Sequence, residues 1–307
     1  MVINKLAFTD PQQAILKTLL YSEIFAFVLT KEEIWQFLIS NQKIAKEDFL
    51  QGLHELSEII VSKNGFYCLR GQEVNILSRR KNAKEIHKKM NLAKKAVFYL
   101  SFIPTIKFIG ISGGLALENV KKEDDIDFFI IVEKNTLFMT RFWILLLLEW
   151  LNLRRRRNEQ NASNKICVNF LLDETKIVWP VSKRDLYIAH EIAQLKPVFE
   201  REGMYKQFMA SNKWIEQFLP NTQKNSHKTM GKNWKTNYYN LRFLNNLLEL
   251  LNFELIVKKI QRFYIKRHIT VEVVTDRILA FHPNDYRVKT LEALRTKCAK
   301  IGLLTNF

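Results

Sequence analysis

The stretch Gly110-Ile-Ser-Gly-Gly-Leu-Ala-Leu, followed by Asp124-Asp-Ile-Asp-Phe-Phe-Ile-Ile, decides the fold of this chain. A Gly-Gly turn leads from one apolar run into a short helix, and an acidic pair opens the next apolar run. Three such runs are typical of buried strands: residues 107–111, 126–132 and 166–172. Since the apolar segment 137–153 joins the last two, the pattern predicts a mixed α/β (α+β) fold in which residues 106–220 form a small sheet flanked by helices.

The acidic pair consists of Asp125 and Asp127, separated by one residue on the second strand. Their side chains therefore project from one face, about 7 Å apart along the strand. Two neighbouring carboxylates at the end of a buried strand repel each other unless a cation neutralises them. Because oxygen ligands suit hard cations, the pair is a candidate Mg²⁺ or Mn²⁺ site.

The turn before the acidic pair has the composition of a phosphate contact. Gly113 and Gly114 lack side chains, so a triphosphate can approach their backbone closely, and Ser112 adds a hydroxyl. A metal-bound nucleoside triphosphate held this way would present its α-phosphorus to an incoming hydroxyl. Either motif alone is common in turns and loops. The glycine turn and the acidic pair together, at this spacing, support the hypothesis of a site for a metal-bound triphosphate.

These residues resemble the nucleotidyltransferase superfamily typified by DNA polymerase beta, whose motif is a Gly-Gly or Gly-Ser turn followed by Asp-x-Asp. The resemblance covers residues 106–173. A wider similarity to bacterial proteins with a winged helix before such a domain includes residues 185–197 and 281–285. The resemblance to the superfamily implies that Asp125 and Asp127 are catalytic and bind metal, and that Ser112, Gly113 and Gly114 contact the nucleotide.

One position departs from the superfamily pattern. Members usually carry a third acidic residue on the following strand, where this chain has Asn169. An asparagine can coordinate a cation through its carbonyl oxygen, but it cannot accept a proton. Asp173, about 13 Å further along the strand, and Glu191, on a later helix, are alternative third ligands or bases. Both also fit ordinary structural positions, a turn and a helix face.

The first 75 residues have the pattern of a winged helix. Apolar residues at helical spacing predict a helix over residues 12–27, and Thr30 with Glu33 forms a capping box for a second. A third helix over residues 46–58 precedes a hairpin that turns at Asn64-Gly65. Because the third helix is acidic, it is poorly suited to a DNA groove. Docking to a partner, or to the rest of the chain, is the alternative.

Basic residues are concentrated after the hairpin. Residues 76–105 are predicted to form one long linking helix with a solvated basic face, carrying Arg79, Arg80, Lys81, Lys84, Lys88, Lys89, Lys94 and Lys95. The chain has a net charge of +17. Such a surplus attracts nucleic acid, nucleotides or acidic lipids. A lysine-rich background composition is the alternative explanation.

Other features limit the class of protein. The three cysteines lie far apart without a CxxC spacing, which argues against disulfides or a zinc site and favours buried positions. No signal peptide opens the chain, so a cytoplasmic location is expected. Arg141 and Glu149 interrupt the apolar segment 137–153, which favours a buried helix over a transmembrane span. Residues 221–307 are predicted to form a helical region, with a polar linker over residues 221–233 and helices over residues 234–268 and 284–301.

Three functions fit these observations. The first is metal-dependent transfer of a nucleoside monophosphate from a triphosphate to a hydroxyl on RNA, a protein or a small molecule. The second is a DNA-binding or nucleotide-sensing regulator whose nucleotidyltransferase fold is catalytically silent because of Asn169. The third is a component of a toxin–antitoxin system, which would involve a protein partner.

Overall fold

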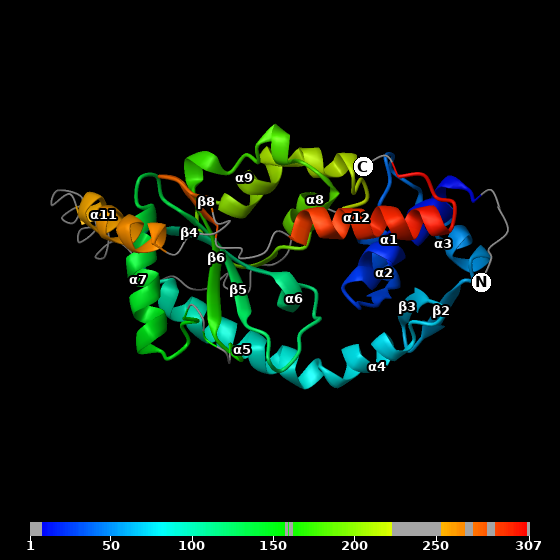
Figure 1. The fold of residues 1–307 in the computed structure, drawn as a ribbon, viewed down its shortest axis with the longest axis horizontal. Helices are drawn as coiled ribbons and strands as arrows, with labels where there is room; N and C mark the ends of the chain where they lie inside the picture. The colour runs from blue at the N-terminus through cyan, green and yellow to red at the C-terminus, as the bar shows by residue number, and fades with distance from the viewer. Residues whose placement is uncertain are drawn as a thin grey trace.

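The computed structural model describes residues 8–156, 159, 162–222, 253–267, 273–280 and 286–305. They form the mixed α/β (α+β) fold predicted from the sequence, elongated in Figure 1. Within these residues, no helix combines the length and apolar character needed to cross a membrane.

The N-terminal region has the element order predicted for a winged helix. It comprises α1 (Asp10–Ile24), β1 (Leu29–Thr30), α2 (Lys31–Gln36), α3 (Lys46–Glu55), β2 (Ile60–Lys63) and β3 (Phe66–Leu69). The predicted capping box is present, since the Thr30 hydroxyl accepts from the Glu33 amide and the Glu33 carboxylate accepts from the Thr30 amide. The hairpin β2–β3 also pairs with β1, a two-residue strand too short for a sequence pattern to reveal.

The basic segment differs from the single solvated helix that was predicted. It forms two helices, α4 (Val74–Lys81) and α5 (Ala83–Leu100), divided at Asn82. Arg79 is buried against Phe27 and Phe66 and pairs with Glu33, 2.7 Å away. Lys89 of α5 is buried as well. Some basic residues of this segment are therefore exposed to solvent, and others are part of the packed structure.

A six-stranded sheet forms the centre of the remaining chain, with the strand order β7-β4-β5-β6-β9-β8. The three predicted strands are present, and three shorter ones flank them. The bounds are β4 (Ile106–Ser112), β5 (Ile126–Val132), β6 (Ile166–Asp173), β7 (Lys196–Glu200), β8 (Val273–Val274) and β9 (Ile278–Ala280). Strands β4 and β5 are antiparallel, whereas β5 and β6 are parallel and are joined by α7 (Leu137–Trp150).

Alternating residues of β5 divide the core into two apolar clusters. Ile126, Phe128 and Ile130 pack with α5 and α7 on one face, as predicted for the buried segment 137–153. Phe129 and Ile131 point to the other face, where α8 (Leu186–Ala193), α9 (Met204–Ser211) and the N-terminal helices lie. Asp127 shares the parity of Phe129, so the acidic pair belongs to this second face.

The second face is continuous with the N-terminal region. The ring of Tyr21 on α1 stacks on His190 of α8 with 4.0 Å between centroids. The C-terminal helix α12 (Tyr286–Lys300) lies across α1, where Lys297 pairs with Glu23 at 3.0 Å (Figure 1). One apolar cluster thus contains residues from the N-terminal region, from the sheet with its helices, and from the C-terminal helix α12.

The region predicted to be helical, residues 221–307, contains α11 (Phe253–Lys266) and α12, and it also supplies β8 and β9 to the sheet. Strand β9 pairs antiparallel with β6. These strands have only two and three residues, so they leave no periodic signal. The remainder of the predicted helix over residues 234–268, and residues 281–285, lie outside the described part of the chain.

Candidate metal and nucleotide site

The site lies where β4 and β5 pair and the chain enters the short helix α6 (Gly113–Ala116). Ser112 is the register partner of Asp127, so the turn after β4 lies directly beside the acidic pair. Asp125 precedes β5, and Asp127 is its second residue. The parallel partner of Asp127 on β6 is Cys167. Three chain segments that the sequence separates by up to 55 positions therefore meet at one end of the central strands β4, β5 and β6.

Gly113 is required by its contact with Asp127. Its φ of +62° lies in the left-handed region, and a Cβ at this position would be 2.6 Å from Asp127 Oδ2. A Cβ on Gly114 would lie 2.6 Å from the carbonyl oxygen of Asn119. The two glycines thus let the turn pack tightly against the strand that carries Asp127 and against the loop that follows α6.

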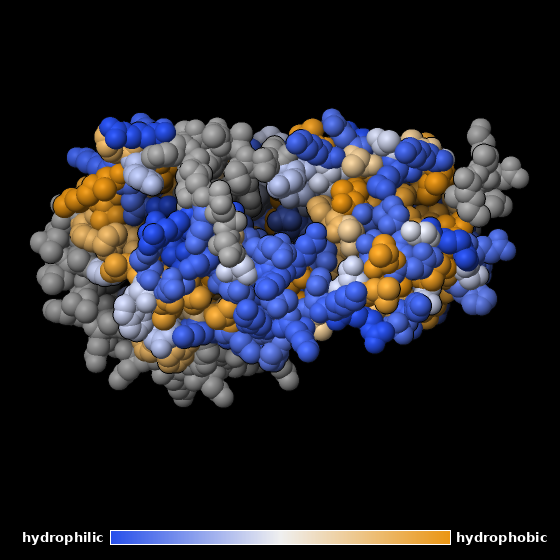
Figure 2. Space-filling view, turned by 60° about the horizontal axis from the view of Figure 1, so that its bottom comes forward, coloured by the Kyte–Doolittle hydropathy of each residue, from blue (hydrophilic) through white to orange (hydrophobic). Residues whose placement is uncertain are grey.

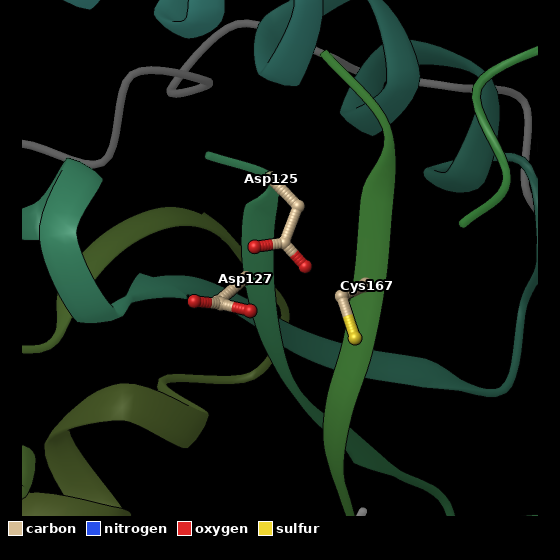
Figure 3. Close-up of side chains that lie close together, drawn as sticks. All are labelled: Asp125, Asp127 and Cys167. Carbon is tan, nitrogen blue, oxygen red and sulfur yellow. The ribbon is translucent and has the colours of Figure 1, made fainter. Parts of the chain in front are cut away.

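The carboxylates converge with a thiol that the sequence pattern did not single out. One ligand atom each from Asp125, Asp127 and Cys167 lies within 4.8 Å of the others (Figure 3). Cys167 was expected only to be a buried apolar residue. Its alternation with Asn169 on β6 is the signal that places it on this face.

Asn169 occupies the position predicted for the third acidic residue. Its Nδ2 donates a hydrogen bond to Asp127 Oδ1, and its Oδ1 accepts from the Cys167 thiol at 2.7 Å. The pairing of β5 and β6 shifts between Phe128 and Phe129, which places Asn169 at an irregularity of the ladder. Asn169 therefore orients Asp127, and it leaves no proton acceptor of its own at this position.

Arg155 is a second residue that the sequence analysis did not identify. It lies in the polar connector after α7, and its Nη1 donates to Asp125 Oδ2. The Arg155 amide donates to the Ile166 carbonyl oxygen at 3.0 Å, which fixes the backbone of the arginine beside the first residue of β6. The run of four arginines over residues 154–157 was the only available signal.

The loop before Asp125 is tied to the basic helix α5. Lys89 is fully buried, and its ammonium donates to the carbonyl oxygens of Lys122 and Asp124 at 3.1 and 2.6 Å. Burial lowers the pKa of Lys89 from its ordinary value. A lysine predicted to face solvent thus anchors the loop that positions the acidic pair.

The electrostatics of the site favour the protonated state of its buried acids. Burial first, and then repulsion by Asp125, raise the pKa of Asp127 well above its usual range. Burial, followed by repulsion from Asp127, raises the pKa of the Cys167 thiol to about 12. Two crowded carboxylates beside a neutral thiol form a site that a cation would stabilise. The charged donors are oxygens, which fits Mg²⁺ or Mn²⁺.

The other candidate ligands differ in position. Glu191, on α8, lines the same cavity as Ser112 and Asn169, and burial raises its pKa to about 7. Asp173 is not brought to the site. Its carboxylate accepts from the amides of Asn135 and Thr175, at 2.9 and 2.8 Å, and from the Thr175 hydroxyl. Asp173 therefore has the alternative role, that of a turn residue at the far end of β6.

Comparisons of the chain with protein-family models, with curated proteins and with solved structures found no match.

Proposed function

We propose that this protein is a metal-dependent nucleotidyltransferase, which moves a nucleoside monophosphate from a nucleoside triphosphate to a hydroxyl acceptor on RNA, a protein or a small molecule. The observation that carries the proposal is the packing of Gly113 against Asp127. It joins a side-chain-free turn, where phosphates can approach the backbone, to a carboxylate pair suited to a divalent cation.

Each group of residues at the site has its own role in the proposed reaction. Asp125 and Asp127 hold Mg²⁺ or Mn²⁺, while Ser112, Gly113 and Gly114 bind the triphosphate. The bound cation would neutralise the phosphate oxygens and favour departure of pyrophosphate. Asn169 keeps the Asp127 carboxylate in place through its hydrogen bond. Arg155 adds a cation at the open side of the pair, where phosphate charge would gather.

Glu191 supplies the proton acceptor that Asn169 cannot. It lines the cavity that reaches Ser112 and Asn169, and its raised pKa of about 7 matches that of a general base near neutral pH.

A transfer assay tests this function. The protein is incubated with each α-labelled nucleoside triphosphate, Mg²⁺ and RNA, protein or small-molecule acceptors, beside the double variant Asp125→Ala/Asp127→Ala. We expect Mg²⁺-dependent labelling by the native protein and none by the double variant. Glu123→Gln, an exposed acid on the same loop, is the matched control and should label like the native protein. Equal labelling by the native protein and the double variant would refute the proposal.

A nucleotide-sensing or DNA-binding regulator is the second candidate, because Asn169 replaces the expected acid and basic side chains are exposed on α4 and α5. Turned with its lower side forward, the molecule is largely hydrophilic over the middle of its face (Figure 2). Nucleotide-modulated duplex binding without any labelled product would favour this candidate. A toxin–antitoxin role would show itself by a protein partner that co-purifies with the chain.

A further inference from the structure

A cavity of about 300 Å³ lies between the sheet face of the acidic pair and the helices α8 and α12. Ser112, Asn169 and Glu191 contribute to its lining. Ser112 is the register partner of Asp127, and Asn169 is hydrogen-bonded to it, so two of the lining residues adjoin Asp127. A molecule bound in the cavity would therefore lie against Glu191 and beside the residues that adjoin the acidic pair.

The wall of the cavity along the sheet is aromatic. The rings of Phe129 and Phe170 stack with 5.1 Å between centroids and an interplanar angle of 2°. Trp179 continues this stack against Phe170, at 5.3 Å and 24°. All three residues line the cavity. This aromatic wall presents apolar surface, which favours an apolar ring system in the ligand.

The size of the cavity limits what can enter it. Small-molecule sites have volumes of about 300–1,000 Å³, so this one is at the lower end. Elements from three parts of the chain enclose it: the sheet, α8, and the C-terminal Tyr286 and Arg287. An RNA helix or a folded protein surface does not fit such a space. A small molecule with one ring system does.

We propose that this cavity is the acceptor site and that the acceptor is a small alcohol carrying a planar aromatic ring. This assignment rests on the proposed nucleotidyl transfer. The ring packs against the wall that Phe170 and Trp179 form, and the hydroxyl lies beside Glu191, toward Ser112 and Asn169. The hydroxyl oxygen forms a bond to the α-phosphorus, the bond from that phosphorus to the bridging oxygen breaks, pyrophosphate leaves, and the hydroxyl proton passes to Glu191.

Ligand titrations on the full chain test the assignment, with three probes followed by NMR or calorimetry. Indole-3-ethanol represents aromatic alcohols, sorbitol represents alcohols without a ring, and a non-hydrolysable nucleoside triphosphate with Mg²⁺ represents the nucleotide donor. We expect indole-3-ethanol to bind and, with a labelled triphosphate and Mg²⁺, to become labelled. Sorbitol should not bind, and the non-hydrolysable triphosphate should not displace indole-3-ethanol.

Two isoleucines provide matched variants. Ile188→Trp fills the cavity and should weaken binding of indole-3-ethanol at least tenfold. Ile256→Trp places the same side chain on an exposed position of α11 and should leave binding unchanged. Trp179→Leu removes an aromatic ring from the wall of the cavity without filling the cavity, so it should weaken binding of indole-3-ethanol severalfold. This third variant tests the assignment even if Ile188→Trp does not fold.

Several results would overturn the acceptor assignment. They are displacement of indole-3-ethanol by the non-hydrolysable triphosphate, equal binding of sorbitol, absence of binding by indole-3-ethanol, and unchanged binding in both cavity variants. Mn²⁺ binding by the native protein is measured in parallel. If Mn²⁺ and triphosphate bind but the aromatic alcohol does not, the acceptor assignment fails alone. If Mn²⁺ does not bind, the proposed function fails as well.

Discussion

Arg155 donates a hydrogen bond to the Asp125 carboxylate, so a guanidinium lies at the carboxylate pair that is proposed to hold a divalent cation. Arg155 is anchored through its backbone to the start of β6, whereas its side chain is partly exposed. The arginine offsets part of the repulsion between Asp125 and Asp127. It also competes with a metal ion for Asp125.

Replacing Arg155 should therefore strengthen metal binding. We expect Arg155→Gln to raise the Mn²⁺ affinity a few-fold, because an exposed ion pair contributes up to about 1 kcal/mol. Electron paramagnetic resonance of free Mn²⁺ measures the change. Arg156→Gln is the control, since Arg156 pairs with Glu149 instead. A lower Mn²⁺ affinity in Arg155→Gln would show that the arginine supports the site rather than competes for it.

Gly113 and Gly65 form a pair that separates backbone strain from the site contact. Both have positive φ, but a Cβ would clash with Asp127 only at Gly113 and meets nothing within 4 Å at Gly65. An alanine in the left-handed region costs about 1–2 kcal/mol. We expect Gly65→Ala to lose about that much unfolding free energy in urea and to bind Mn²⁺ normally. Gly113→Ala should also lose Mn²⁺ binding, and normal Mn²⁺ binding by this variant would count against the site geometry.

Arg79 should stabilise the N-terminal region far more than its exposed neighbour in the sequence. It is buried, pairs with Glu33 and donates to the Val28 carbonyl oxygen at 2.6 Å. Removing one partner of a buried pair costs about 3–5 kcal/mol. We expect Arg79→Met to lower the unfolding free energy by about 3 kcal/mol and Arg80→Met by less than about 0.5 kcal/mol. Equal losses in urea unfolding would contradict the structural role of Arg79.

His190 should make the fold sensitive to acid. Burial lowers its pKa from 6.5 to about 3, so the folded protein holds it neutral. Between these values only the unfolded chain is protonated at this residue. Its contribution to stability is therefore complete above pH 6.5 and is lost as the pH falls, by up to about 1.4 kcal/mol per pH unit.

The variant His190→Phe isolates this effect, because it keeps a ring against Tyr21 and cannot be protonated. We expect its unfolding free energy to fall less steeply than that of the native protein between pH 6 and about pH 4. His54→Gln, at an exposed position of α3, should follow the native curve. The same slope for the native protein and His190→Phe would mean that His190 is not held neutral in the fold.

Local patterns predicted much of this structure. The apolar runs over residues 107–111, 126–132 and 166–172 are long enough to mark buried strands, and they form β4, β5 and β6. The capping box at Thr30 is a contact between residues three apart, so the sequence alone contains it. The alternation of side chains along a strand predicted that Asp125 and Asp127 share one face. The register of β4 and β5 places the glycine turn beside them.

Contacts between distant segments could not be predicted in the same way. Strand β7 is an edge strand of five residues. It pairs with β4, which is distant in the sequence, so a local pattern does not reveal it. Arg79 and Lys89 belong to a basic row by sequence, and only the packing of α4 and α5 buries them. Cys167 and Arg155 likewise join the site through the parallel pairing of β6 with β5, which no local pattern contains.

Mn²⁺ titration in the presence and absence of a non-hydrolysable nucleoside triphosphate tests the central claim most directly, since both enzyme and sensor require the site to bind metal and nucleotide. For the native protein and Glu123→Gln, we predict Mn²⁺ binding that the triphosphate strengthens. For Asp127→Asn, we predict that binding falls at least tenfold and no longer responds to the triphosphate. Equal Mn²⁺ binding by all three proteins, with no effect of triphosphate, would contradict the account.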